Sequence, residues 1–317
     1  MKRILATFCM CAASLAAAFS VPGKPVRIIV GVPPGGGTDL SARLVAERLQ
    51  SLTGVPVLVE NRPGAAFMIA AQEVARAAPD GHTLLYTPDS VLTLLPHVTE
   101  KLGYDASRSF TPISLGARGA IALVAHASLP AANVQELVAY ARARPGELSF
   151  ASAGTATPFH LYGEMLKQQA GLDMVHIPYK GAGDVGKDIV SGRVQLMFAA
   201  SSGAVQFARS GRVRILAVAG TTRTSLLPGV PTMAEQGYPG FEIDTWLGWF
   251  GPAQMRPEVV DKVNVLLRQA LADPRLKERF QEGGYEAQPS SPAELAAMVR
   301  HGHERWRSLV RQVGPLK

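Results

Sequence analysis

Short apolar runs recur along this chain, and stretches with the periodicity of an amphipathic helix separate them. The runs are rich in Val, Ile and Leu, as strands buried on both faces are. They cover residues 26–32, 57–59, 83–86, 121–125, 148–151, 174–177, 196–199 and 215–219. Alternation of strands with helices is typical of βα units around mainly parallel sheets. The sequence therefore predicts an α/β fold.

The first predicted helix shows the pattern that supports this interpretation. Five apolar residues fall on one of its faces, and Gly54 ends it. They are Leu40, Leu44, Val45, Leu49 and Leu52. Further helices are predicted over residues 66–76, 134–144, 159–169, 185–191, 257–272 and 292–313. The Pro- and Gly-rich passage from 226 to 258 has few strand or helix signals and is expected to cross the surface, with its two tryptophans packing in a core or at a rim.

The N-terminus has the composition of a secretory signal peptide. Lys2 and Arg3 precede an apolar run that stops near Phe19, and small residues follow where cleavage would occur. A membrane anchor is the alternative, but the run is shorter than the roughly 20 residues that span a bilayer. We therefore predict a signal peptide over residues 1–20 and a periplasmic mature protein. Both cysteines, Cys9 and Cys11, fall inside the signal, so neither a disulfide nor a thiolate site is expected.

The charge balance gives little support to a nucleic-acid partner. Removing Lys2 and Arg3 lowers the formal net charge from +7 to +5, and the remaining Lys and Arg are scattered without interleaved aromatics. The basic balance therefore favours anionic partners only weakly.

A glycine-rich stretch joins the first predicted strand to the first predicted helix. Gly35, Gly36 and Gly37 allow close backbone approach, and Thr38 or Asp39 could cap a helix that starts near Leu40. Unpaired N–H groups at a helix N-terminus attract anions. A phosphate loop would need Gly-Lys-Ser/Thr and a dinucleotide fold G-x-G-x-x-G, and neither motif is present. A tight turn without a ligand is the alternative.

Two later loops repeat the order of strand, small-residue turn and helix. One, at residues 150–160, contains Ser152, Gly154, Thr155 and Thr157. The other, at 176–184, contains Tyr179, which could either close over a ligand or pack on the protein. Open α/β sheets bind ligands at the carboxyl ends of their strands, so two of these helix N-termini could converge on one acidic ligand.

These loops, together with Glu60-Asn61-Arg62-Pro63-Gly64-Ala65 and the segments 78–85 and 230–237, strongly resemble one family. It is the Bug family of periplasmic solute-binding receptors, which serve tripartite tricarboxylate transporters. The resemblance implies a two-lobed, type II periplasmic-binding-protein-like fold that closes on a small carboxylate. The chain would cross between lobes twice, so that lobe one comprises residues 21–123 and 220–317 and lobe two residues 124–219.

The resemblance also implies a set of ligand-binding residues. One end of the carboxylate would meet backbone amides of the loop formed by Pro34, Gly35, Gly36, Gly37, Thr38 and Asp39. Lobe two would contribute Ser152, Gly154, Thr155 and Thr157, with Tyr179 bordering the pocket and hydroxyls from Thr87 and Ser90. An ionised Asp39 facing a carboxylate would repel it, so we expect Asp39 to orient the loop or to meet the ammonium group of an amino-acid ligand.

The sequence departs from the family in several places, and the segments 183–186 and 200–203 are less typical of it. Ala156 stands where the second loop commonly has glycine, and His82 replaces a usual tyrosine and is expected at the surface.

An enzyme is the less favoured interpretation. Neither G-x-S-x-G nor H-E-x-x-H occurs, and no cofactor or metal site is expected. His301 and His303 are expected on a solvated helix face, and His160 and His176 in hydrogen bonds rather than catalysis. The sequence favours a monomeric receptor that closes on its ligand and delivers it to membrane components. An exported enzyme with an oxyanion or phosphate site, and a receptor that docks on a sensor kinase, remain alternatives.

Overall fold

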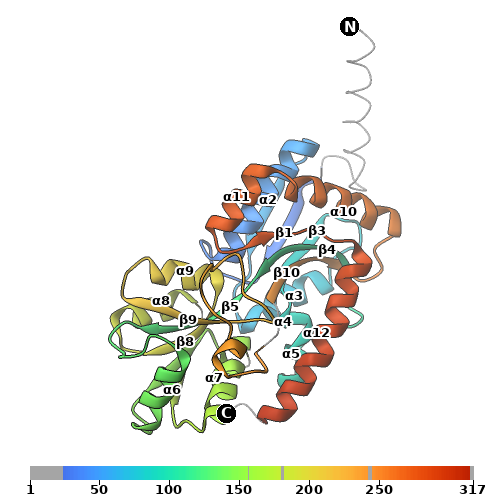
Figure 1. Cartoon of the computed structure of the whole chain (residues 1–317). Helices are drawn as coiled ribbons and strands as arrows, with labels where there is room; N and C mark the ends of the chain where they lie inside the picture. The colour runs from blue at the N-terminus through green and yellow to red at the C-terminus, as the bar shows by residue number, and fades with distance from the viewer. Residues whose placement is uncertain (1–23, 156, 180–181, 242–244, 315–317) are drawn as a thin grey trace, which may run out of the picture.

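The computed structural model describes residues 24–155, 157–179, 182–241 and 245–314 of the chain (Figure 1). The predicted signal peptide, residues 1–20, lies outside the described residues, as do Ala156, Lys180 and Gly181. The predicted α/β class is confirmed, because two sheets are flanked by helices on both faces.

The first sheet has six strands in the order β11-β4-β10-β3-β1-β2. β1 pairs in parallel with β2 and β3, whereas β10 runs antiparallel between β3 and β4. The strands are β1 (Val26–Val30), β2 (Val57–Asn61), β3 (Thr83–Pro88), β4 (Phe110–Gly119), β10 (Thr245–Pro252) and β11 (Glu286–Ala287).

Helices cover both faces of this sheet because side chains alternate along each strand. Ile28 faces α2, α10 and α11, and Ile29 faces α3 and the short helices α4 and α5. The helices are α2 (Gly37–Thr53), α3 (Met68–Ala75), α4 (Ser90–Thr93), α5 (Leu95–Val98), α10 (Pro257–Leu271) and α11 (Pro274–Glu282).

The second sheet has five strands in the order β7-β6-β8-β5-β9. α6 and α7 pack on one face and α8 and α9 on the other. The strands are β5 (Ile121–His126), β6 (Ser149–Ser152), β7 (Val175–Pro178), β8 (Leu196–Ala200) and β9 (Val213–Ala219). The helices are α6 (Val134–Arg142), α7 (Pro158–Ala170), α8 (Ala182–Ser191) and α9 (Ser201–Ala208).

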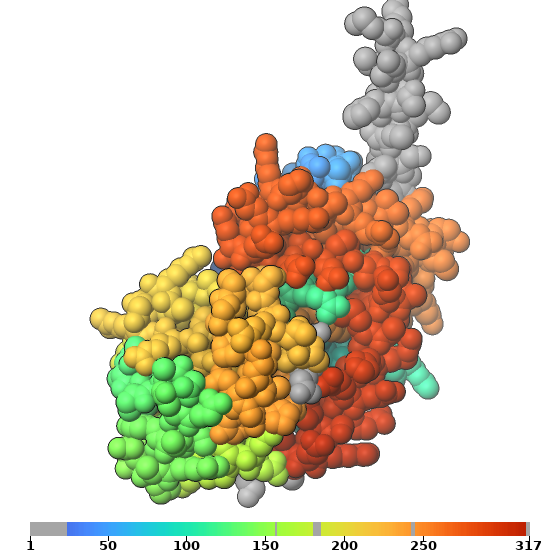
Figure 2. Space-filling model, in the orientation of Figure 1, coloured from blue at the N-terminus to red at the C-terminus, as the bar shows by residue number. Residues whose placement is uncertain are grey.

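The two sheets are joined directly at Ala120, between the end of β4 and the start of β5. After β9 the chain stays on the second sheet, where Met233 and Phe241 enter its core, and the amber residues of this segment lie across that half in Figure 2. α12 (Pro292–Val313) packs on both halves, with Leu295 in a core of the first sheet and Trp306 in that of the second. The predicted lobe borders stay a prediction. Phe241 packs in the core of the second sheet, and Thr245 begins β10 of the first.

The prediction that the Pro- and Gly-rich passage crosses the surface is wrong for β10. This strand lies inside the first sheet, and Trp246 and Trp249 are buried there. The bulky side chains at 246 and 250 occupy the space that a side chain at Gly248 would need, so the glycine that hides the strand pattern is what allows the packing.

Two smaller expectations are also corrected. His82 is fully buried rather than at the surface, because it precedes β3 and its Nδ1 lies 3.3 Å from the carbonyl oxygen of Pro25. Leu40, predicted on the buried face of the first helix, is 53% exposed because it lines a cleft. Among the described helices, none combines the length and the apolar character needed to cross a membrane.

Candidate functional site

A cleft of about 1820 Å³ is lined by residues from both sheets. The carboxyl ends of β1, β3 and β8 reach it through Gly31, Pro88 and Ala200. This placement matches the general rule that α/β sheets bind ligands beyond the carboxyl ends of their strands. The N-termini of the longer helices α2, α7 and α9 also line it.

The glycine loop (residues 34–39) turns the chain from β1 into α2 at the edge of the cleft. Gly35 has a φ of 89°, a conformation that glycine adopts without strain, and Gly36 is the N-cap without a side-chain bond. α2 begins at Gly37, so the prediction that Thr38 or Asp39 caps a later helix is wrong. The first helical bond joins Leu40 N–H to Gly36, at 2.9 Å. The N–H groups of Gly37 and Thr38 precede it and have no place in the helical ladder.

Asp39 explains how the loop keeps this shape. Its carboxylate is 1% exposed and accepts hydrogen bonds from Gly35 N–H (2.9 Å), Asn61 Nδ2 (2.8 Å) and Arg43 Nε (3.0 Å). Burial acts to raise the pKa of Asp39, but the bonds from Arg43, Gly35 and Asn61 outweigh it and hold the pKa below its usual value. Asp39 is not among the cleft-lining residues, whereas Pro34, Gly35, Gly36, Gly37 and Thr38 are. This geometry favours the expectation that Asp39 orients the loop.

Replacing Asp39 with alanine is expected to lower the free energy of unfolding by about 2 kcal/mol, because Arg43, Asn61 and Gly35 lose a buried acceptor. Carboxylate affinity should fall together for every ligand as the loop loses its shape. Denaturant unfolding and calorimetry measure the two effects. A selective loss of amino-acid ligands would instead mean that Asp39 meets their ammonium group.

The second loop (residues 152–157) is held by a chain of side-chain hydrogen bonds. Ser152 Oγ donates to the carbonyl oxygen of Gly154 at 2.9 Å, and Thr157 Oγ1 donates to the same oxygen at 2.8 Å. His176 Nε2 lies 2.8 Å from Ser152 Oγ. Because the single hydroxyl hydrogen of Ser152 goes to Gly154, His176 is the donor in this pair. Thr157 caps α7 and lines the cleft, whereas Ser152, Gly154 and Thr155 are not among its lining residues.

His176 stacks on His160, with ring centroids 3.7 Å apart. Burial lowers the pKa of His176 to about 4 and also lowers the pKa of His160, so both rings are neutral at pH 7. The expected hydrogen bonding is seen for His176, whereas neither ring nitrogen of His160 has a hydrogen-bond partner among the described residues. A histidine that donates to a serine does not activate it as a nucleophile.

His176 is expected to make the protein less stable as the pH falls from about 6.5 to 4. An unfolded histidine titrates near 6.5 and the native one near 4, so the unfolded chain binds more protons between these values. Allowing for partial exposure, the loss should reach about 2 kcal/mol and level off below pH 4. Asp89 acts in the opposite direction, because its pKa is raised to about 6 by burial.

Urea unfolding across this pH range checks the prediction. His176→Gln keeps an amide donor toward Ser152 but does not titrate, so its stability should depend less on pH, while Asp89 and His160 still titrate in both proteins. Equal slopes for the two proteins would contradict the assignment.

Only one of the remaining predicted site residues lines the cleft. Ser90 lines the cleft, but Thr87 is fully buried outside its lining. Tyr179 donates from its hydroxyl to Asp188 Oδ2 at 2.6 Å and does not line the cleft, so it packs on α8. Burial and Asp188 raise its pKa to about 12.

Sequence reasoning missed two features of the cleft. Asp89 is buried beneath Ser90, where Thr245 Oγ1 donates to it at 3.0 Å, and Thr245 lines the cleft. The N-terminus of α9 brings Ser202 and Gly203 to the cleft. The N-terminus of α9 did have a sequence signal, because small residues and then a helix follow strand β8. The contact between Thr245 and Asp89 spans 156 residues, so it left no local pattern.

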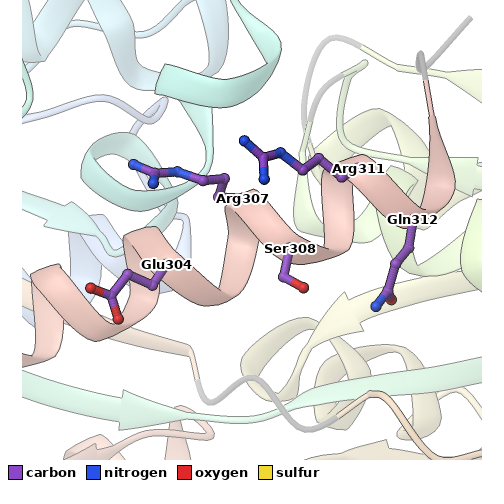
Figure 3. A pocket seen from close by; sticks show the side chains of 5 residues that line it. All are labelled: Glu304, Arg307, Ser308, Arg311 and Gln312. Carbon is purple, nitrogen blue, oxygen red and sulfur yellow. The ribbon is translucent and has the colours of Figure 1, made fainter.

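A second hollow, of about 360 Å³, lies along the end of α12 (Figure 3). Arg307 and Arg311 stand on one side of the helix there, and none of the predicted ligand-binding residues lines it. His301 is exposed, whereas His303 packs on the ring of His97 at 4.2 Å. No group of three or more His, Cys, Asp or Glu that could hold a metal ion occurs within the described ranges.

Comparison with known proteins gives a consistent result. Residues 41–315 match the family described as the tripartite tricarboxylate transporter family receptor. The chain is 33% identical to Protein BugT of Bordetella pertussis over 298 residues, 92% of this chain and 90% of that protein. It is also similar to the structure of R. palustris Rpa4515 with adipate, with 31% identity, a TM-score of 0.88 and coverage of 93% and 99% of the two chains. Its similarity to MatC from Rhodopseudomonas palustris with bound malate is comparable, with 30% identity, a TM-score of 0.84 and coverage of 92% and 100%.

Proposed function

The chain belongs to the tripartite tricarboxylate transporter receptor family, and we propose that it captures a small organic carboxylate in the cleft and delivers it to the membrane components of such a transporter. As a member of this family, it is a periplasmic solute-binding receptor rather than an enzyme. Binding would shift the two lobes from an open to a closed arrangement, which the membrane partner recognises. No observation favours the sensor-kinase alternative. The signal peptide at residues 1–20 stays part of the proposal.

The observation that carries the proposal is the convergence of helix N-termini on one cleft from both sheets. Gly37 and Thr38 lie in the first turn of α2 on one side, and the cap residue Thr157 and Phe159 lie at the start of α7 on the other. Each N-terminus carries roughly half a unit of positive charge and N–H groups outside the helical ladder. An anion held between them would draw the two lobes together.

The charge of Asp39 does not oppose such a ligand. Its two oxygens are occupied by Gly35, Asn61 and Arg43, so its negative charge is neutralised beneath the loop rather than presented to the cleft. We propose that Pro34, Gly35, Gly36, Gly37 and Thr38 bind one end of the carboxylate, with Thr157 and Ser90 contributing hydroxyls.

Fewer residues than predicted therefore contact the ligand directly in this proposal. We propose that Ser152, Gly154 and Thr155 act through the shape of the second loop. The same applies to Tyr179, which packs on α8, and to Thr87, which is buried within β3 near its end. The solved relatives that hold adipate and malate support a mono- or dicarboxylate as the ligand class.

Titration calorimetry with a panel of carboxylates tests the proposal. One acid should bind with a stoichiometry of one, and chromatography after long incubation should recover it unchanged. Phosphate and nucleotides should give no heat of binding. Catalytic loss of the bound acid would favour the exported-enzyme alternative and overturn the receptor.

A further inference from the structure

The loop between β2 and α3 holds an unusual backbone conformation. Ala65, Ala66 and Phe67 have φ values of 47°, 51° and 73°, directly after Gly64 at 129°. Side chains disfavour the left-handed region, and residues other than glycine normally enter it singly. Three such residues in succession persist only where the surrounding structure determines the conformation, and strain of this kind clusters at ligand sites.

Packing on both sides of the loop holds it in place. The Phe67 ring occupies the space above Gly31, where an added Cβ would lie 2.6 Å from Cδ1 of Phe67. On the chain before and after the loop, Arg62 Nε bonds Glu73 at 2.8 Å, and Arg27 Nη2 bonds the same carboxylate at 2.6 Å. These ion pairs connect the end of β2 and strand β1 with α3, on either side of the strained segment.

The position of the Phe67 ring connects the backbone strain with the cleft. Gly31 and Phe67 both line the cleft, and Gly31 stands just before the glycine loop. Phe67 packs on the same apolar cluster as Trp246 and Leu95, which also line the cleft. An apolar wall therefore adjoins the N–H groups at the start of α2.

We propose that Phe67 is a specificity-determining residue of this cleft, whose ring selects carboxylates with an aliphatic or aromatic body over heavily hydroxylated ones. The inference rests on the proposed function and adds the ligand class to it. A hydroxyl placed against the ring would lose its hydrogen bonds to water without replacement, whereas methylene groups there leave water favourably.

Two matched ligands test whether the Phe67 ring selects the body of the carboxylate. Adipate and galactarate are six-carbon diacids that differ only in the four hydroxyls of galactarate. Calorimetry should find adipate the tighter ligand of the unmodified protein. Phe67→Gly should weaken adipate binding about tenfold and leave galactarate within about twofold, because burial of two methylene groups is worth about this factor. Phe67→Asn, which tolerates the left-handed conformation, should shift the preference further toward galactarate.

Ala66→Gly is the matched control, because it relieves the neighbouring strain and keeps the ring. Ala66→Gly should raise Tm by about 2 °C. Phe67→Gly relieves strain in the same way but loses the packing of the ring, so its Tm should be lower than that of Ala66→Gly. Only Phe67→Gly should change the ratio of the two affinities. An unchanged ratio in Phe67→Gly overturns this inference and leaves the receptor function standing. If the unmodified protein binds neither these two acids nor any other acid of the carboxylate panel, the proposed function and this inference both fail.

Discussion

Replacing Gly36 with leucine is expected to weaken carboxylate binding more than about 100-fold while the fold stays intact. The backbone of Gly36 has φ −73° and ψ 159°, which any residue adopts without strain. An added Cβ would meet nothing closer than the carbonyl oxygen of Pro33 at 3.7 Å. The rest of a leucine side chain would therefore project into the cleft, over the first N–H groups of α2, where the anion is expected.

Calorimetry with the tightest ligand of the carboxylate panel measures this loss, and Tm reports the fold. Gly36→Ala is the graded control, because one methyl group should reduce affinity far less than leucine. Gly154→Leu should also reduce binding, but its φ of 131° adds backbone strain and a lower Tm. Unchanged affinity in both leucine variants would place the carboxylate elsewhere.

Trp249→Ala is expected to lower the free energy of unfolding by about 4 kcal/mol, the range for truncating a large buried aromatic residue. Trp249 is fully buried and stacks on Tyr86 with ring centroids 4.2 Å apart. The ring lies over Gly116, where an added Cβ would be 2.5 Å from Nε1. Its removal leaves a cavity between β3, β4 and β10 that the rigid sheet cannot close.

Urea unfolding gives the free energy for this variant. Leu58→Ala is the control, because Leu58 is 50% exposed and should cost less than about 1 kcal/mol. A loss of similar size at the two positions would show that β10 is not the packed interior strand described above.

The fold was predictable where a strand carries its own apolar run. All eight runs became strands, because burial on both faces leaves a local signal such as the Val and Ile residues of β1. β10 and β4 were missed because Gly248 and Gly116 interrupt the pattern to make room for aromatic rings from distant parts of the chain. The space for these rings depends on tertiary packing, so the local sequence does not predict it.

The site was predictable to a similar extent. The glycine loop and the cap at Thr157 follow from short-range patterns and line the cleft. The direction of a side chain such as Tyr179 depends on Asp188, and the burial of Asp89 depends on Thr245, so the sequence around each residue did not determine them. The positive φ values at Ala66 and Phe67 were hidden for the same reason, because the ring of Phe67 packs over Gly31 from a distant part of the chain.

The most direct test of the receptor assignment is mass spectrometry of the ligand released from the purified protein. We expect one small carboxylate per chain, released chemically unchanged on denaturation and able to rebind to the refolded protein. Release of a neutral or cationic solute, or of a mixture of a substrate and its product, would contradict it.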